Sequence, residues 1–231
     1  MPESQPAVSL LESLRARSAA LRNADLPSGR PAAEVMRDID RRLLSTFRWL
    51  DEALGHLDAI RPHVRHRFEV DPVLTLVAPR YDGGFVSCRR RAIAGLDLIE
   101  RIELFYRMAG DTPLRFEIRH AGVAAMSERL RAVQLEFDYR IQHDERRALR
   151  HARFTVAPVV TASVLFCPDY HRSVVAVSLR NVDRLESVAL EFLPEAIDEP
   201  ALEDLVRLML GESNVFLKRA PLARVGVRAG G

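Results

Sequence analysis

Two short stretches of the chain bring together side chains that ligate metals or act as nucleophiles. His63 and His66 stand three residues apart, so on a helix their imidazoles would share a face, as metal ligation requires. They follow Pro62 directly and lie among arginines, whose positive charge opposes a bound cation, so we expect a solvated helix end there. Cys167 precedes His171 by four residues, and a thiolate beside an imidazole would be nucleophilic. A β-turn does not by itself join these two side chains, and we expect Cys167 to be a small apolar group on a strand.

A third arrangement combines carboxylates with a guanidinium group. Asp111 precedes Glu117-Ile118-Arg119, which alternates like a strand. Two such carboxylates could hold Mg²⁺ while the arginine steadies a phosphate. Over about ten residues this layout resembles the core of restriction-endonuclease-like nucleases, in which Pro-Asp is followed by Asp/Glu-x-Lys on a strand. Arg119 stands where that family has lysine, and Asp111 is unusually close to Glu117. Alternating Glu and Arg also fits ordinary cross-strand pairing on a solvated strand face.

The remaining sequence contains none of the common catalytic or nucleotide-binding motifs. There is no glycine-rich phosphate loop, no Gly-x-Ser-x-Gly elbow, no His-Glu-x-x-His and no Cys-x-x-Cys. The two cysteines, Cys88 and Cys167, are too few for a disulfide framework. The longest apolar run, 156–167, is the length of a strand and too short to span a membrane. We therefore expect a cytoplasmic protein, without a membrane segment, a cofactor or a metal, and more plausibly a binding protein than an enzyme.

The charge is unevenly distributed along the chain. Its 34 basic and 32 acidic residues nearly balance. Residues 183–212, however, hold nine acids against Arg184 and Arg207, a net charge of −7, which leaves +9 for the remainder. Such asymmetry is typical of a polyanion site, of an acidic face for a basic partner, of docking within a dimer, or of solvated faces alone. The candidate polyanion-binding residues are Arg89, Arg90, Arg91, Arg140, Arg146, Arg147, Arg150 and Arg153.

One long helix is predicted before the strands begin. Pro31 suits its first turn, and it should end near Ile60, before Pro62. Its apolar residues recur every three or four positions, close to a heptad repeat. The stripe could pair with a shorter helix predicted over 8–22, form a coiled coil with another subunit, or lie on the following sheet. The candidate oligomer seam is Met36, Ile39, Leu43, Phe47, Leu50, Leu54 and Leu57.

After residue 66 the pattern changes to the period of two that is typical of strands. Tyr81-Asp82-Gly83-Gly84 predicts a hairpin turn between strands near 73–77 and 85–88. A helix is expected over about 122–132, and a last helix over 198–210 with Gly211 as its C-cap. The further strands are expected near 102–106, 114–118, 135–141, 151–167, 173–180 and 187–193.

These elements predict an α+β fold with an N-terminal helical hairpin (1–66), a largely antiparallel sheet domain (67–222) with the last helix packed on it, and a disordered tail (223–231). Leu76 to Tyr81 aligns with Leu165 to Tyr170, which raises the hypothesis of a duplicated hairpin near 73–91 and 162–180.

Three functions are consistent with these patterns. The leading one is a non-catalytic protein-interaction or regulatory module that binds a protein partner or itself, most simply as a homodimer. The second is polyanion or nucleic-acid binding through the arginine-rich strand and hairpin. The third is a metal-dependent nuclease that uses Asp111 and Glu117.

Overall fold

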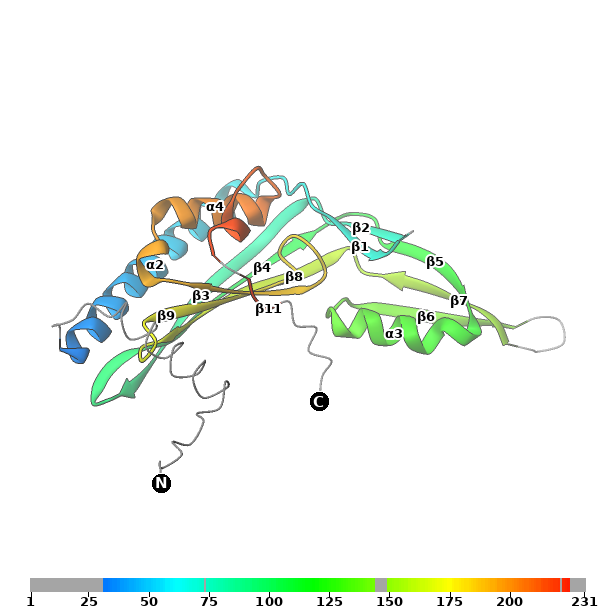
Figure 1. Cartoon of the computed structure of the whole chain (residues 1–231). Helices are drawn as coiled ribbons and strands as arrows, with labels where there is room; N and C mark the ends of the chain where they lie inside the picture. Colours follow the sequence, from blue (N-terminus) through cyan, green and yellow to red (C-terminus); the bar gives the residue numbers. More distant parts are fainter. Residues whose placement is uncertain (1–30, 73, 144–148, 221, 225–231) are drawn as a thin grey trace, which may run out of the picture.

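The computed structural model describes residues 31–72, 74–143, 149–220 and 222–224 (Figure 1). The fold is α+β, with mostly antiparallel sheets, as the sequence predicts. The helices are α2 (Ala32–Ile60), α3 (Val123–Ala132) and α4 (Glu199–Leu210), and the strands are β1 (Arg67–Asp71), β2 (Leu74–Val77), β3 (Arg80–Ile93), β4 (Leu96–Ala109), β5 (Leu114–Arg119), β6 (Phe137–His143), β7 (Leu149–Val156), β8 (Val159–Asp169), β9 (Val174–Arg180), β10 (Ser187–Phe192) and β11 (Leu222–Arg224).

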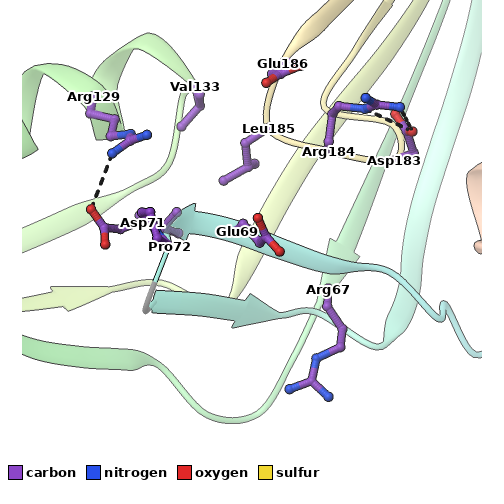
Figure 2. Close-up of a pocket in the computed structure, with 11 residues that line it drawn as sticks. Arg67, Glu69, Asp71, Pro72, Arg129, Val133, Asp183, Arg184, Leu185 and Glu186 are labelled. Carbon is purple, nitrogen blue, oxygen red and sulfur yellow. Dashed lines mark hydrogen bonds and ion pairs between the residues drawn. The ribbon is translucent and has the colours of Figure 1, made fainter.

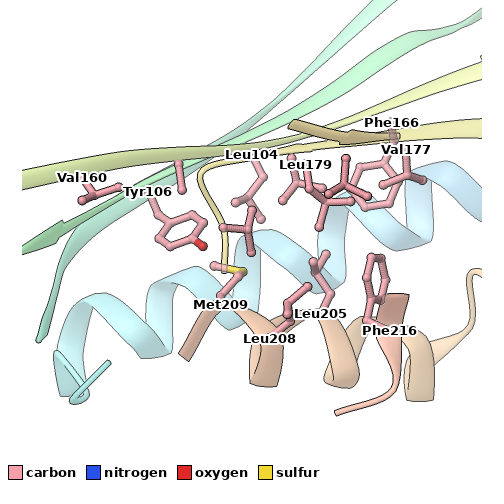
Figure 3. Close-up of a cluster of buried hydrophobic side chains, with 14 of the residues drawn as sticks. Leu104, Tyr106, Val160, Phe166, Val177, Leu179, Leu205, Leu208, Met209 and Phe216 are labelled. Atoms are coloured by element: carbon pink, nitrogen blue, oxygen red, sulfur yellow. The ribbon is translucent and has the colours of Figure 1, made fainter. Parts of the chain in front are cut away.

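A six-stranded antiparallel sheet, in the order β11-β10-β9-β8-β4-β3, forms the body of the protein. Alternate residues of its central strands point to one face, where α2 and α4 cover them (Figures 1 and 3). Leu104, Val164 and Val177 are buried there, and Leu205 and Met209 of α4 pack over them. The hydrophobic core therefore lies between this face and the two helices.

The apolar stripe of α2 belongs to that core. Six of the seven seam residues (Met36, Ile39, Leu43, Leu50, Leu54 and Leu57) are buried, Phe47 is half-buried, and α2 contacts β3 and β4. The predicted oligomer seam therefore packs within one chain, against the six-stranded sheet. The predicted spacing of apolar residues along α2 is correct, but a spacing of about 3.5 residues suits packing on a sheet as well as packing on another helix. The helix predicted over 8–22 lies outside the described residues.

Helix α4 has the predicted boundaries. The carboxylate of Asp198 accepts a hydrogen bond from the backbone N–H of Ala201 at 2.9 Å, and Gly211 ends the helix with a φ of 72°. His66 donates from Nε2 to the carbonyl oxygen of Leu208 at 2.6 Å. This oxygen also accepts from the backbone N–H of Gly211 at 3.1 Å, so His66 adds a second hydrogen bond at the end of the helix.

The predicted hairpin turn at residues 81–84 is wrong. β2 pairs with β1, and β3 runs through Gly83 and Gly84 to pair with β4. The register shifts between Tyr81 and Gly84, and Gly83 has a φ of 110°, so the two glycines form a bulge in a continuous strand. A Cβ on Gly84 would lie 2.7 Å from the carbonyl oxygen of Phe105. Only the second of the two aligned segments is a hairpin, formed by β8 and β9.

A smaller antiparallel sheet, β5-β7-β6, continues from the ends of β4 and β8 (Figure 1). We call strands β5, β6 and β7, together with helix α3, the arm. At its base the N–H of Gly110 donates to the carbonyl oxygen of Pro158 at 2.7 Å. A Cβ on Gly110 would lie 2.5 Å from the carbonyl oxygen of Val77. The close packing at this glycine fixes the joint between arm and sheet.

The last residue of β9 and the residue after it provide a second attachment for the arm. Arg180 donates from Nη2 to the carbonyl oxygen of Ala132 at 2.8 Å, and Asn181 donates from Nδ2 to that of Val133 at 2.9 Å. Both acceptors are at the C-terminal end of α3, where carbonyl groups lack partners within the helix.

None of the helices in the described ranges is long and apolar enough to cross a membrane. At the C-terminus, β11 pairs with β10, so strand structure extends two residues into the predicted tail. Residues 225–231 lie outside the described part of the chain.

Candidate functional site

Strand register gives the arm one apolar face and one polar face. Phe116, Phe154 and Tyr139 stand opposite one another across β5, β7 and β6, and so share a face. The residues between them point to the other side. We call this second set the polar arm face: Arg115, Glu117 and Arg119 of β5; His151, Arg153 and Thr155 of β7; Asp138, Arg140 and Gln142 of β6.

The apolar face is packed against α3. The ring centroids of Phe116 and Tyr139 lie 5.2 and 5.0 Å from that of Phe154, which is fully buried. Leu130 of α3 is fully buried as well, and the guanidinium of Arg131 lies 5.6 Å from the ring centroid of Phe137. The phenylalanine and tyrosine rings of the arm sheet are therefore used for packing, and the polar arm face carries no Phe, Tyr or Trp.

The polar arm face has a net positive charge. It holds four arginines and two carboxylates, a net charge of +2 with His151 neutral, and all six charged side chains are exposed. Glu117 accepts a hydrogen bond from Nε of Arg153 at 2.8 Å, and its Oε1 lies 2.7 Å from Nη2 of the same arginine. Among the described residues, Arg115, Arg119 and Arg140 have no ion-pair partner. Three guanidinium groups on one sheet face are thus available to contact an anionic ligand.

The arginine run at residues 89–91 has a different environment. Arg89 and Arg91 both pair with Glu100 at 3.0 Å. Arg90 pairs with Asp97 at 2.9 Å and with Asp40 of α2 at 3.2 Å. The three arginines are matched by three carboxylates, and they lie on β3 at the end of the six-stranded sheet away from the arm (Figure 1). The fold does not bring the two predicted arginine groups together.

Of the five arginines predicted between residues 140 and 153, Arg140 and Arg153 lie on the polar arm face. Arg150 belongs to β7, and Arg146 and Arg147 lie outside the described residues. Arg115 and Arg119 were missed as members of this site. Their alternation with Phe116 and Ile118 marked them as outward-facing, but only the pairing of β5 with β7 puts them beside Arg153.

The candidate nuclease carboxylates are separated and individually paired. Asp111 accepts from Nη2 of Arg80 at 2.6 Å, and Glu117 accepts from Arg153 on the polar arm face. Within the described ranges, no group of three or more His, Cys, Asp and Glu side chains is arranged to hold a metal ion.

The residues around Cys167 have structural roles. Burial raises the pKa of the Cys167 thiol, which favours the protonated, weakly nucleophilic form. Asp169 accepts from the backbone N–H groups of His171 and Arg172, each at 3.1 Å, and so closes the turn after β8. The hydroxyl of Tyr170 donates to the carbonyl oxygen of Ile99 at 2.8 Å.

A cleft of about 550 Å³ lies between β1, the end of α3 and the β9–β10 loop (Figure 2). Its walls mix arginines and carboxylates, and Arg129 pairs with Asp71 at 3.4 Å. Arg184 pairs with Asp183 at 2.7 Å. Since both signs of charge alternate along the cleft, it has no clear preference for a cation or an anion.

No family model, curated protein or solved structure matches this chain.

Proposed function

We propose that the protein is a non-catalytic module that binds a polyanion, most favourably a nucleic-acid duplex, through the polar arm face. The observation that carries this proposal is the register of β5-β7-β6, which aligns four exposed arginines on one side of a projecting sheet. Arginine suits this role because its planar guanidinium bonds phosphate oxygens bidentately and stays charged at every physiological pH.

The dimensions of the face fit several phosphates. Arg115 and Arg119 are four residues apart on β5, about 13 Å, and β6 lies about 10 Å from β5 across β7. Three or four phosphate contacts correspond to a slope of about −3 in log affinity against log salt.

The chemistry of the face favours a duplex over a single strand. Proteins that bind single strands stack bases on aromatic side chains, and the rings of the arm sheet are packed on its other face. Contacts to phosphates along a duplex need no such rings.

The test is fluorescence anisotropy with a labelled DNA duplex of about 20 base pairs at about 0.1 M salt. Arg140→Ala removes one phosphate contact. At about 0.1 M salt each contact contributes about 0.9 to the logarithm of the affinity, so the variant is expected to bind about eightfold more weakly. The matched control is Arg91→Ala, which removes the same charge from the paired cluster on β3 and leaves affinity within about twofold. Equal effects of both variants, or no binding at low salt, would contradict the proposal.

Self-association and a cytoplasmic location stay predictions. A homodimer would need a surface other than the buried stripe of α2. The nuclease hypothesis gains no support, because its two carboxylates are separately paired with arginines.

A further inference from the structure

The six-stranded sheet has a second face, opposite α2 and α4. Register across β3, β4, β8 and β9 puts Phe85, Phe105, Ser163 and Arg180 in one row, and Ser87, Glu103, Leu165 and Ser178 in the next. We call this side the outer sheet face. It continues through Cys167, Ala176, Ser178, Ala189 and Glu191. In the described part of the chain, the long helices lie on the other side (Figure 3).

The outer sheet face carries a stacked phenylalanine pair beside several small residues. Phe85 is 59% exposed and stacks on Phe105, with 5.3 Å between ring centroids. Beyond them Ser163, Ser178 and Ala176 are small, so another element could approach the backbone closely. An exposed Phe85 on a half-buried Phe105, beside small residues, suits an amphipathic helix packed on the sheet.

The sequence predicts such a helix over residues 8–22, which precede α2 in the chain. Residues 8–22 carry Leu11, Leu14 and Leu21 at helical spacing, and a helix of that length spans about 22 Å. Asp40 of α2 accepts from the N–H of Ile99 at 2.7 Å and pairs with Arg90, so the start of α2 lies where β3 turns into β4 (Figure 1).

The connector is long enough to reach the outer sheet face. Residues 23–30 extend to about 27 Å, whereas packed layers are about 10 Å apart. The chain has only to pass β3, which is an edge strand of the sheet. A short tether also gives the segment a millimolar effective concentration at this face, which favours it over a second copy of the protein.

We propose that residues 8–22 form a helix that docks on the outer sheet face, with Leu11, Leu14 and Leu21 against Phe85, Phe105 and Leu165. This docking is independent of polyanion binding, since the polar arm face belongs to the other sheet.

Cys167 provides a natural reporter for the docked helix. It lies on the outer sheet face two residues beyond Leu165, within the width of a helix placed there, whereas Cys88 points toward α2. The rate of iodoacetamide modification of each cysteine is measured on the full chain, and mass spectrometry of peptides separates the two sites. Cys88 is thus an internal reference for global unfolding.

Leu14→Asp puts a charge in the docking stripe and is expected to raise the Cys167 rate at least fivefold without changing the Cys88 rate. The matched control is Ala16→Asp, which adds the same charge about 160° away around the helix and leaves both rates unchanged. Equal Cys167 rates in the native protein and both variants would overturn the proposal. So would a Cys167 rate that falls with rising protein concentration together with a dimeric mass in solution, because a second copy would then cover the face.

Discussion

Glu117 is the residue whose replacement best separates polyanion binding from the alternatives. Its Oε1 accepts a hydrogen bond from Nε of Arg153 at 2.8 Å and forms an ion pair with Nη2 at 2.7 Å, and it is one of two carboxylates on the polar arm face. Glu117→Gln keeps the shape and an acceptor oxygen but removes the charge. Arg153 is then free to contact a phosphate, and the net charge of the face rises from +2 to +3.

The expected magnitude follows from this geometry. One added phosphate contact raises affinity for duplex DNA about eightfold at about 0.1 M salt and steepens the salt slope by about 0.9. The side chains of Arg153 and Glu117 are 57% and 44% exposed, so loss of their ion pair costs at most about 1 kcal/mol of folding stability.

The assay is an anisotropy titration of Glu117→Gln against the native protein at three or more salt concentrations, with thermal unfolding measured in parallel. Asp111→Asn is the matched control, since it also removes a carboxylate paired with an arginine, but away from the polar arm face. A Glu117→Gln variant that binds more weakly than the native protein, or equally well, refutes the reasoning. Loss of Mg²⁺-dependent DNA cleavage in that variant would instead favour the nuclease hypothesis.

Three further predictions concern stability, measured as the free energy of unfolding in urea. Gly110→Ala destabilises the protein by about 2 kcal/mol, because the new Cβ would lie 2.5 Å from the carbonyl oxygen of Val77; an unchanged value would mean that the arm joint is loose. Gly55→Ala stabilises by about 0.5–1 kcal/mol, since it lies inside α2 with nothing within 4 Å of the added carbon; destabilisation would contradict the packing described for that helix. Tyr170→Phe costs about 1–2 kcal/mol, because it leaves the carbonyl oxygen of Ile99 without its hydrogen bond, and a neutral result would show that another donor replaces the hydroxyl.

The sequence predicted most elements of the fold because their signals are local. The stripe from Met36 to Leu57, the cap at Asp198 and the alternation in β8 each depend on residues a few positions apart. The turn predicted at Gly83 was wrong because a bulge and a hairpin both need a glycine with positive φ.

The candidate site was only partly predictable because its members come from three strands. Arg89, Arg90 and Arg91 form the most evident basic run in the sequence, yet cross-strand and helix carboxylates match them in the fold. Arg115 and Arg119 belong to no such run. Their position beside Arg140 and Arg153 depends on the register of β5, β7 and β6, which no local pattern encodes.

The most direct test of polyanion binding is the salt dependence of affinity for duplex DNA, measured on the native protein between about 50 and 300 mM salt. Polyanion binding through the polar arm face predicts a linear fall of log affinity with log salt, with a slope of about −3, and a preference for the duplex over a single strand of the same length. Affinity that is independent of salt, or negligible at the lowest concentration, would contradict it.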